Sequence, residues 1–184
     1  MSDLSCFFRL VYKKRDYRMS ILDKSILENI VDHLESKYKV AESWTLVYSS
    51  KEHGFSLRTM IHMLENYIPP YVLICETIHG EKFGVFIDDK ITFSNSLKGK
   101  NNTFLFKYQD QKFKSFNYTG KFPYFCLCDK NYMGFGCSDG KFALVLDSTL
   151  LKGTTASVST FENEKLAATE KFQLKDIEVW QIGF

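Results

Sequence analysis

The chain has 184 residues, of which 45% are apolar and 25% charged, so its composition is that of an ordinary globular protein. This length predicts one domain that buries roughly two thirds of its unfolded surface without needing a metal or disulfide scaffold. The formal net charge of +2 is too small to indicate a nucleic-acid-binding protein, so we expect no nucleic-acid partner.

Residues 1–19 have mixed composition and are interpreted as an N-terminal extension or edge strand, and residues 20–184 as the domain itself. The extension contains the basic residues Lys13, Lys14, Arg15 and Arg18. We interpret them as a solvated segment; the alternative is a weak contact with an acidic lipid or protein surface. Without a signal peptide, a membrane-spanning segment or a lipidation motif, we expect a cytoplasmic protein.

Helical periodicity dominates the first part of the domain. Residues 21–38 place apolar side chains at three- and four-residue spacing, which predicts a helix with Ser20 as its N-cap. Residues 44–48 predict a strand, and residues 49–54 a turn. Ser56 is the predicted cap of a second helix, which Pro69-Pro70 cannot continue.

Apolar alternation then replaces the helical period. Short strands separated by turn residues are predicted at Tyr71–Thr77, Phe83–Ile87, Thr103–Tyr108, Phe113–Tyr118, Tyr124–Cys128, Phe142–Asp147 and Ile177–Ile182. This succession predicts a β-rich α+β fold: a two-sheet antiparallel β-sandwich flanked by about two α-helices.

The order of the motifs resembles the TLDc domain over residues 20–184. The motifs are Trp44 to Ser50, His53 to Leu57, the strand with Gly84, the strand at 103–106, the glycine-hinged hairpin of Gly134 and Gly136 leading to Asp147, residues 153–166, and the closing Glu178 and Trp180. Two positions depart from the family pattern: Asn102 stands where a glutamate is usual, and Gln181 where a glycine is usual. We expect these two changes to affect a ligand site shared with the family more than they affect the fold.

The resemblance implies a function. TLDc proteins protect cells against oxidative stress, and several engage the vacuolar proton pump, the V-ATPase, to alter its assembly or activity. We therefore expect a monomeric, non-enzymatic protein-binding module that contacts cytosolic V-ATPase subunits and is recruited in this way to endolysosomal or vacuolar membranes.

Two motifs each have a functional and a structural interpretation. His53-Gly54-x-Ser56 places a histidine near a hydroxyl, but a turn glycine and a helix cap explain the same spacing. Gly134-x-Gly136 lacks the strand–helix context of a dinucleotide site and more simply lets a strand bend or another backbone approach.

Glu178 and Trp180 share one face of a strand, where Glu178 is expected to be a hydrogen-bond hub.

The cysteines allow a different class of function. Five are present, namely Cys6, Cys75, Cys126, Cys128 and Cys137, and the odd number favours reduced thiols. Cys126 and Cys128 share a strand face and are expected to be packed. The alternative is a thiol-based redox protein that uses Cys126, Cys128 or Cys137. No cofactor is expected, and no metal site, since the four histidines have no partners at ligand spacing.

Overall fold

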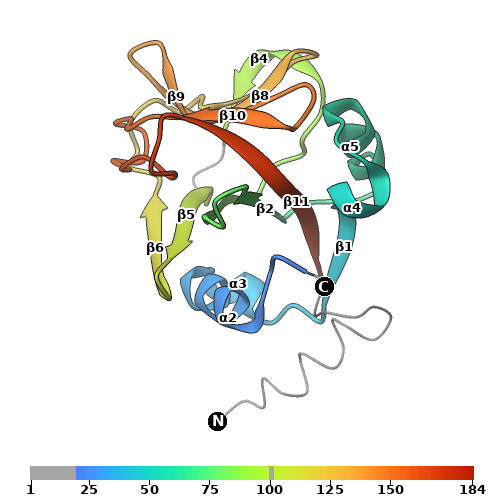
Figure 1. The fold of residues 1–184 in the computed structure, drawn as a ribbon. Coiled ribbons are helices and arrows are strands. Elements are labelled where there is room, and N and C mark those ends of the chain that lie inside the picture. Colours follow the sequence, from blue (N-terminus) through green and yellow to red (C-terminus); the bar gives the residue numbers. More distant parts are fainter. Residues whose placement is uncertain (1–19, 100–101) are drawn as a thin grey trace.

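The computed structural model describes residues 20–99 and 102–184, so the predicted extension and its four basic residues lie outside the described part. The fold is β-rich and antiparallel, with helices at one face and one side (Figure 1). This confirms the predicted class. The strands are β1 (Ser43–Ser49), β2 (Tyr71–Thr77), β3 (Lys82–Ile87), β4 (Ser94–Lys98), β5 (Phe104–Gln109), β6 (Lys112–Asn117), β7 (Cys126–Cys128), β8 (Tyr132–Ser138), β9 (Lys141–Asp147), β10 (Lys152–Thr155) and β11 (Lys171–Gly183).

The long strand β11 joins the two halves of the sandwich. Its first residues, 171–173, pair with β10, and the order β4-β7-β8-β9-β10 completes one sheet. Its later residues pair with β2 on one side and β1 on the other, and β3, β5 and β6 extend this second sheet. Strand β11 thus crosses between the layers, as the red ribbon in Figure 1 shows.

Two apolar cores hold the layers together. The larger lies between the sheets and takes Ile177 and Val179 from β11. The smaller lies between the β2–β3 side of the second sheet and the N-terminal helices, and takes Trp180 and Ile182 from the same strand. Because neighbouring residues of a strand face opposite ways, β11 contributes to both cores.

The predicted helix at 21–38 is wrong in detail. The structure has α2 (Lys24–His33) and the single turn α3 (Ser36–Lys39), separated by Leu34 and Glu35 in extended conformation. The N-cap is Asp23, whose Oδ1 accepts a 3.0 Å hydrogen bond from the backbone N of Ile26, and not Ser20. The break lets Leu34 and Tyr38 both reach the smaller core.

The region after β1 also differs from prediction. Residues predicted as a turn contain the single helical turn α4 (Ser50–His53). Helix α5 (Leu57–Leu64) follows, and Ser56 caps it as predicted, since Ser56 Oγ accepts a hydrogen bond from Thr59 N.

Three strands were not predicted: β4, β8 and β10. Strand β4 is polar and exposed, β10 has four residues including Gly153, and β8 contains two glycines, so none carries a clear apolar alternation. No helix within the described residues is long and apolar enough to cross a membrane.

Candidate functional site

His53, Gly54 and Ser56 lie at the joint between α4 and α5. His53 Nδ1 lies 3.1 Å from both the backbone nitrogen and the carbonyl oxygen of Ser49. Gly54 ends α4 with φ of +73°, a conformation that favours glycine. Ser56 Oγ accepts from Thr59 N. Each side chain therefore bonds to nearby backbone, as expected of a helix joint.

The glycines of the resemblance lie where backbone or rings approach closely. A Cβ at Gly84 would lie 2.1 Å from the carbonyl oxygen of Leu73 on the neighbouring strand. A Cβ at Gly134 would lie 2.8 Å from the Phe142 ring, and Gly136 has φ of +70°. These positions require the absence of a side chain for packing.

The cysteines lie in packed surroundings. Cys75 and Cys128 are buried, and Cys126 and Cys137 are half-buried. Burial raises the pKa of the Cys75 and Cys126 thiols far above the ordinary range and that of Cys128 to about 12. Since the thiolate is the nucleophile, burial makes these three thiols less reactive. Cys6 lies outside the described residues.

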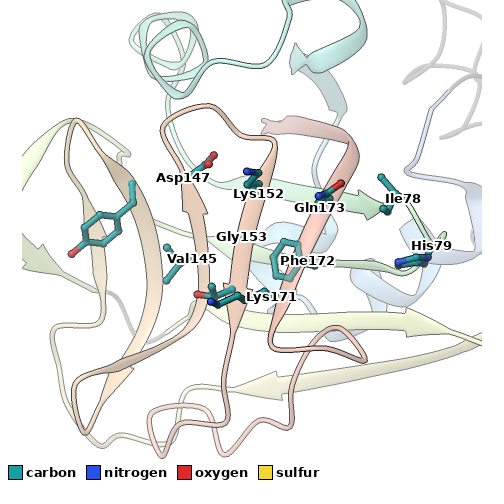
Figure 2. A pocket seen from close by; sticks show the side chains of 11 residues that line it. Ile78, His79, Val145, Asp147, Lys152, Gly153, Lys171, Phe172 and Gln173 are labelled. Carbon is teal, nitrogen blue, oxygen red and sulfur yellow. The ribbon is translucent and has the colours of Figure 1, made fainter.

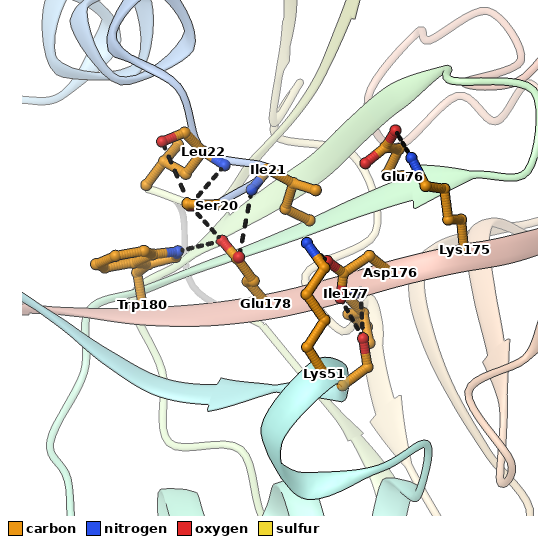
Figure 3. A network of polar contacts seen from close by, with 11 residues as sticks. Ser20, Ile21, Leu22, Lys51, Glu76, Lys175, Asp176, Ile177, Glu178 and Trp180 are labelled. Atoms are coloured by element: carbon orange, nitrogen blue, oxygen red, sulfur yellow. Dashed lines mark hydrogen bonds and ion pairs between the residues drawn. The ribbon is translucent and has the colours of Figure 1, made fainter. Parts of the chain in front are cut away.

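Glu178 and Trp180 point together toward the segment that precedes α2 (Figure 3). Trp180 Nε1 donates to Glu178 Oε2 at 2.9 Å, and the hydroxyl of Ser20 donates to the same oxygen at 2.8 Å. Ile21 N donates to Oε1 at 3.3 Å. Burial raises the pKa of Glu178 despite these three donors. The predicted hub is present, and it attaches the segment before α2 to β11.

A second buried carboxylate, Asp176, is not among the residues that the sequence analysis singled out. Asp176 is fully buried, its Oδ1 accepts from the hydroxyl of Ser50, and its Oδ2 lies 2.6 Å from Lys51 Nζ (Figure 3). The register of β11 against β2 shifts between Leu174 and Asp176, so simple alternation does not place this residue. Asp176 attaches α4 to β11.

Asp147 lies at the end of β9, where it contacts the following turn and also faces a groove. Its Oδ1 accepts from the backbone N and the hydroxyl of Thr149, at 3.1 and 2.7 Å, which fixes the turn into β10. It also lines a groove of about 730 Å³ across β8 to β11 and the β2–β3 turn (Figure 2). The lining is Ile78, His79, Tyr132, Val145, Asp147, Lys152, Gly153, Thr154, Lys171, Phe172 and Gln173.

Sequence reasoning did not find this groove, because its residues come from five separate segments and two of them, β8 and β10, were not predicted as strands. The groove is open to solvent, mostly apolar, and carries Lys152 and Lys171. Across the described ranges, no group of three or more His, Cys, Asp or Glu side chains is placed to hold a metal ion.

Comparison with known proteins identifies the family of the chain. The TLDc domain model matches residues 16–183. The chain is similar to Oxidation resistance protein 1 of Yarrowia lipolytica, with 32% identity over 90% of this chain and 75% of that protein. It is also similar to human Oxidation resistance protein 1, with 32% identity over 84% of this chain and 17% of the human protein. Nuclear receptor coactivator 7 of Gallus gallus is 30% identical over 89% of this chain and 18% of its own length. The chain thus spans less than a fifth of these two vertebrate relatives.

Proposed function

The chain belongs to the TLDc domain family, and on that premise we propose that it is a non-enzymatic protein-binding module that protects against oxidative stress by contacting and regulating the V-ATPase. The observation that carries the proposal is the family match over residues 16–183, which supports a function carried by the TLDc domain. The relatives named Oxidation resistance protein 1 support the oxidative-stress role.

The contacts of the polar candidates support a binding role over an enzymatic one. His53 and Ser56 bond to separate backbone groups, at Ser49 and Thr59. Glu178 accepts three hydrogen bonds within the protein, and Asp176 is paired with Lys51. A catalytic acid or nucleophile has to reach a substrate, whereas these groups hold segments of the fold together.

The alternative function is thiol chemistry at Cys126, Cys128 or Cys137. It requires an accessible thiol of low pKa, and burial acts in the opposite direction on Cys126 and Cys128. The raised pKa values therefore favour the binding proposal over this alternative.

The test is capture of V-ATPase subunits by the purified chain. We expect the immobilised protein to retain subunits of the pump's peripheral, cytosolic part, and we expect a cytosolic protein to be recruited to vacuolar or endolysosomal membranes through that contact. Capture is measured under reducing and oxidising conditions, with a heat-unfolded sample as control. Recovery of no pump subunit in either condition contradicts the proposal.

A further inference from the structure

The groove lies on the outer face of the sheet that contains β8, β9 and β10. Tyr132 pairs with Asp147 across β8 and β9, and Lys152 pairs with Gln173 across β10 and β11. Thr154 pairs with both Val145 and Lys171. Side chains of paired residues share a face, so these pairs form adjacent rows across four strands.

The floor of the groove is apolar. Ile78 follows β2, and 52% of its surface is exposed, although its backbone N donates to Gln173 O and so fixes it beside β11. Val145, which is half-buried on β9, continues the apolar surface, whereas Phe172 is only 7% exposed and packs into the core between the sheets. Gly153 gives the Phe172 ring its space, because a Cβ there would lie 2.5 Å from Phe172 Cζ and 2.3 Å from Val145 O.

The rim is positively charged. Lys152 and Lys171 are exposed, and among the described residues no carboxylate lies within ion-pair distance of either ammonium group. Asp147 brings one carboxylate to the groove, but its Oδ1 already accepts two hydrogen bonds from Thr149. These two lysines, which have no carboxylate partner in the described part of the chain, lie beside the exposed Ile78 and are complementary to an anionic partner with an apolar side chain.

We propose that this groove binds an extended acidic segment of a partner protein, whose carboxylates meet Lys152 and Lys171 while an apolar side chain packs against Ile78 and Val145. The inference rests on the proposed binding function and names the contact face for it. The open shape suits a polypeptide. A flat bilayer surface does not follow a concave floor, and a nucleic acid would require a broader basic surface than two lysines provide.

The first test uses defined peptides and the full chain. The probe is an acetylated and amidated eight-residue peptide of Asp, Glu and Gly with one central Leu; matched peptides replace Leu with Ser, or the acidic residues with Lys. We expect the acidic Leu peptide to shift backbone NMR signals of Ile78, Val145, Thr154 and Phe172, and the two matched peptides to bind much more weakly.

The second test uses charge-reversed variants. Lys152→Glu with Lys171→Glu is expected to weaken binding of the acidic Leu peptide roughly tenfold or more. The control, Lys112→Glu with Lys165→Glu, changes the net charge equally at exposed positions away from the groove and should bind as the unmodified chain does. Equal binding by both variants, signal shifts clustered elsewhere, or no saturable binding at millimolar peptide would overturn the inference.

Pump capture with the same variants separates this inference from the proposed function. Capture by the unmodified chain and the control, but not by the groove variant, supports both. Peptide binding in the groove without capture by any form contradicts the V-ATPase proposal and leaves the groove assigned. Capture that survives in the groove variant shows that the pump does not occupy the groove, and overturns it as the contact face.

Discussion

The indole Nε1 of Trp180 donates a 2.9 Å hydrogen bond to Oε2 of Glu178, two residues earlier on β11, and both side chains are almost completely buried. The same carboxylate also accepts hydrogen bonds from Ser20 Oγ and Ile21 N. Among the described residues, the groups that donate to this carboxylate are all uncharged. These donors favour the ionised form and burial opposes it, so Glu178 makes the stability of the domain depend on pH.

Replacing Glu178 by Gln should change the pH dependence of stability. Burial raises the pKa of Glu178 above its ordinary value of 4.5, so the native state keeps this proton to higher pH than the unfolded state. The free energy of unfolding contributed by this group therefore falls as pH rises between those two values, by at most about 1.4 kcal/mol per pH unit. We expect the advantage of the unmodified chain over Glu178→Gln to be largest near pH 4.5 and to shrink as pH rises, as measured by urea unfolding.

Glu162→Gln is the control for that measurement. Glu162 is an exposed carboxyl whose pKa Lys121 lowers, so it is ionised in both states above pH 5 or so, and its substitution should give a flat difference there. The difference in the free energy of unfolding between the unmodified chain and Glu178→Gln is the quantity to compare. If this difference is also independent of pH, or grows as pH rises, it contradicts the assignment of a raised pKa to Glu178.

The pair of Lys51 and Asp176 is expected to be strongly coupled. Removing the cation with Lys51→Met leaves a fully buried carboxylate held by Ser50 and by the backbone N of Ile177. Because Lys51 is partly exposed, we expect a loss of about 1 to 3 kcal/mol in the free energy of unfolding. In an Asp176→Asn background the same substitution should cost much less.

A double-mutant cycle by urea unfolding measures this coupling. The matched pair is Lys175 with Glu76, at 2.9 Å, where the lysine is exposed and solvent screens the charge, so a smaller coupling is expected. Additive effects of Lys51→Met and Asp176→Asn would show that the 2.6 Å contact does not stabilise the fold.

Gly84 should tolerate no side chain. The Cβ of Gly84→Ala would lie 2.1 Å from Leu73 O and 2.6 Å from the Phe106 ring, so strands β2 and β3 have to move apart. We expect a loss of about 3 kcal/mol or more. Gly80→Ala is the control: it introduces the same methyl group into open space at φ of +83°, and should cost about 1 to 2 kcal/mol. Similar losses for both variants in thermal unfolding would refute the close-packing argument.

Sequence patterns predict the strands that bury one or both faces. The prediction for β2, Tyr71–Thr77, matches the structure residue for residue, because all but one of its positions are buried and β-branched or aromatic residues dominate. Strand β10 has four residues, and its identity depends on pairing with β9 and β11. Such pairing is a property of distant segments, which a local pattern does not contain.

The polar sites also divide into those that local spacing predicts and those that depend on distant segments. Ser56 and the Glu178–Trp180 face follow from local spacing, which is why the sequence predicts them. Asp176 and the groove do not. Asp176 follows a shift of register in β11, and the groove brings Ile78 next to residues almost a hundred positions later. Predicting either one would require knowing which strands pair, and these strands are far apart in the sequence.

The buried thiols are expected to react slowly in the folded protein. In a Cys6→Ser, Cys137→Ser variant the remaining thiols are Cys75, Cys126 and Cys128, and burial raises the pKa of all three. For Cys128, a change from 9.0 to about 12 lowers the thiolate fraction near pH 8 about a thousandfold. We expect an aromatic disulfide reagent to modify this variant in native buffer only at the slow rate of local opening, and to modify all three thiols rapidly in guanidinium. The same assay on a Cys6→Ser variant, which keeps Cys137, reports the reactivity of Cys137. Rapid modification of any of the three in native buffer would revive thiol chemistry as the function, because a nucleophilic thiol has to exist as thiolate in the folded protein.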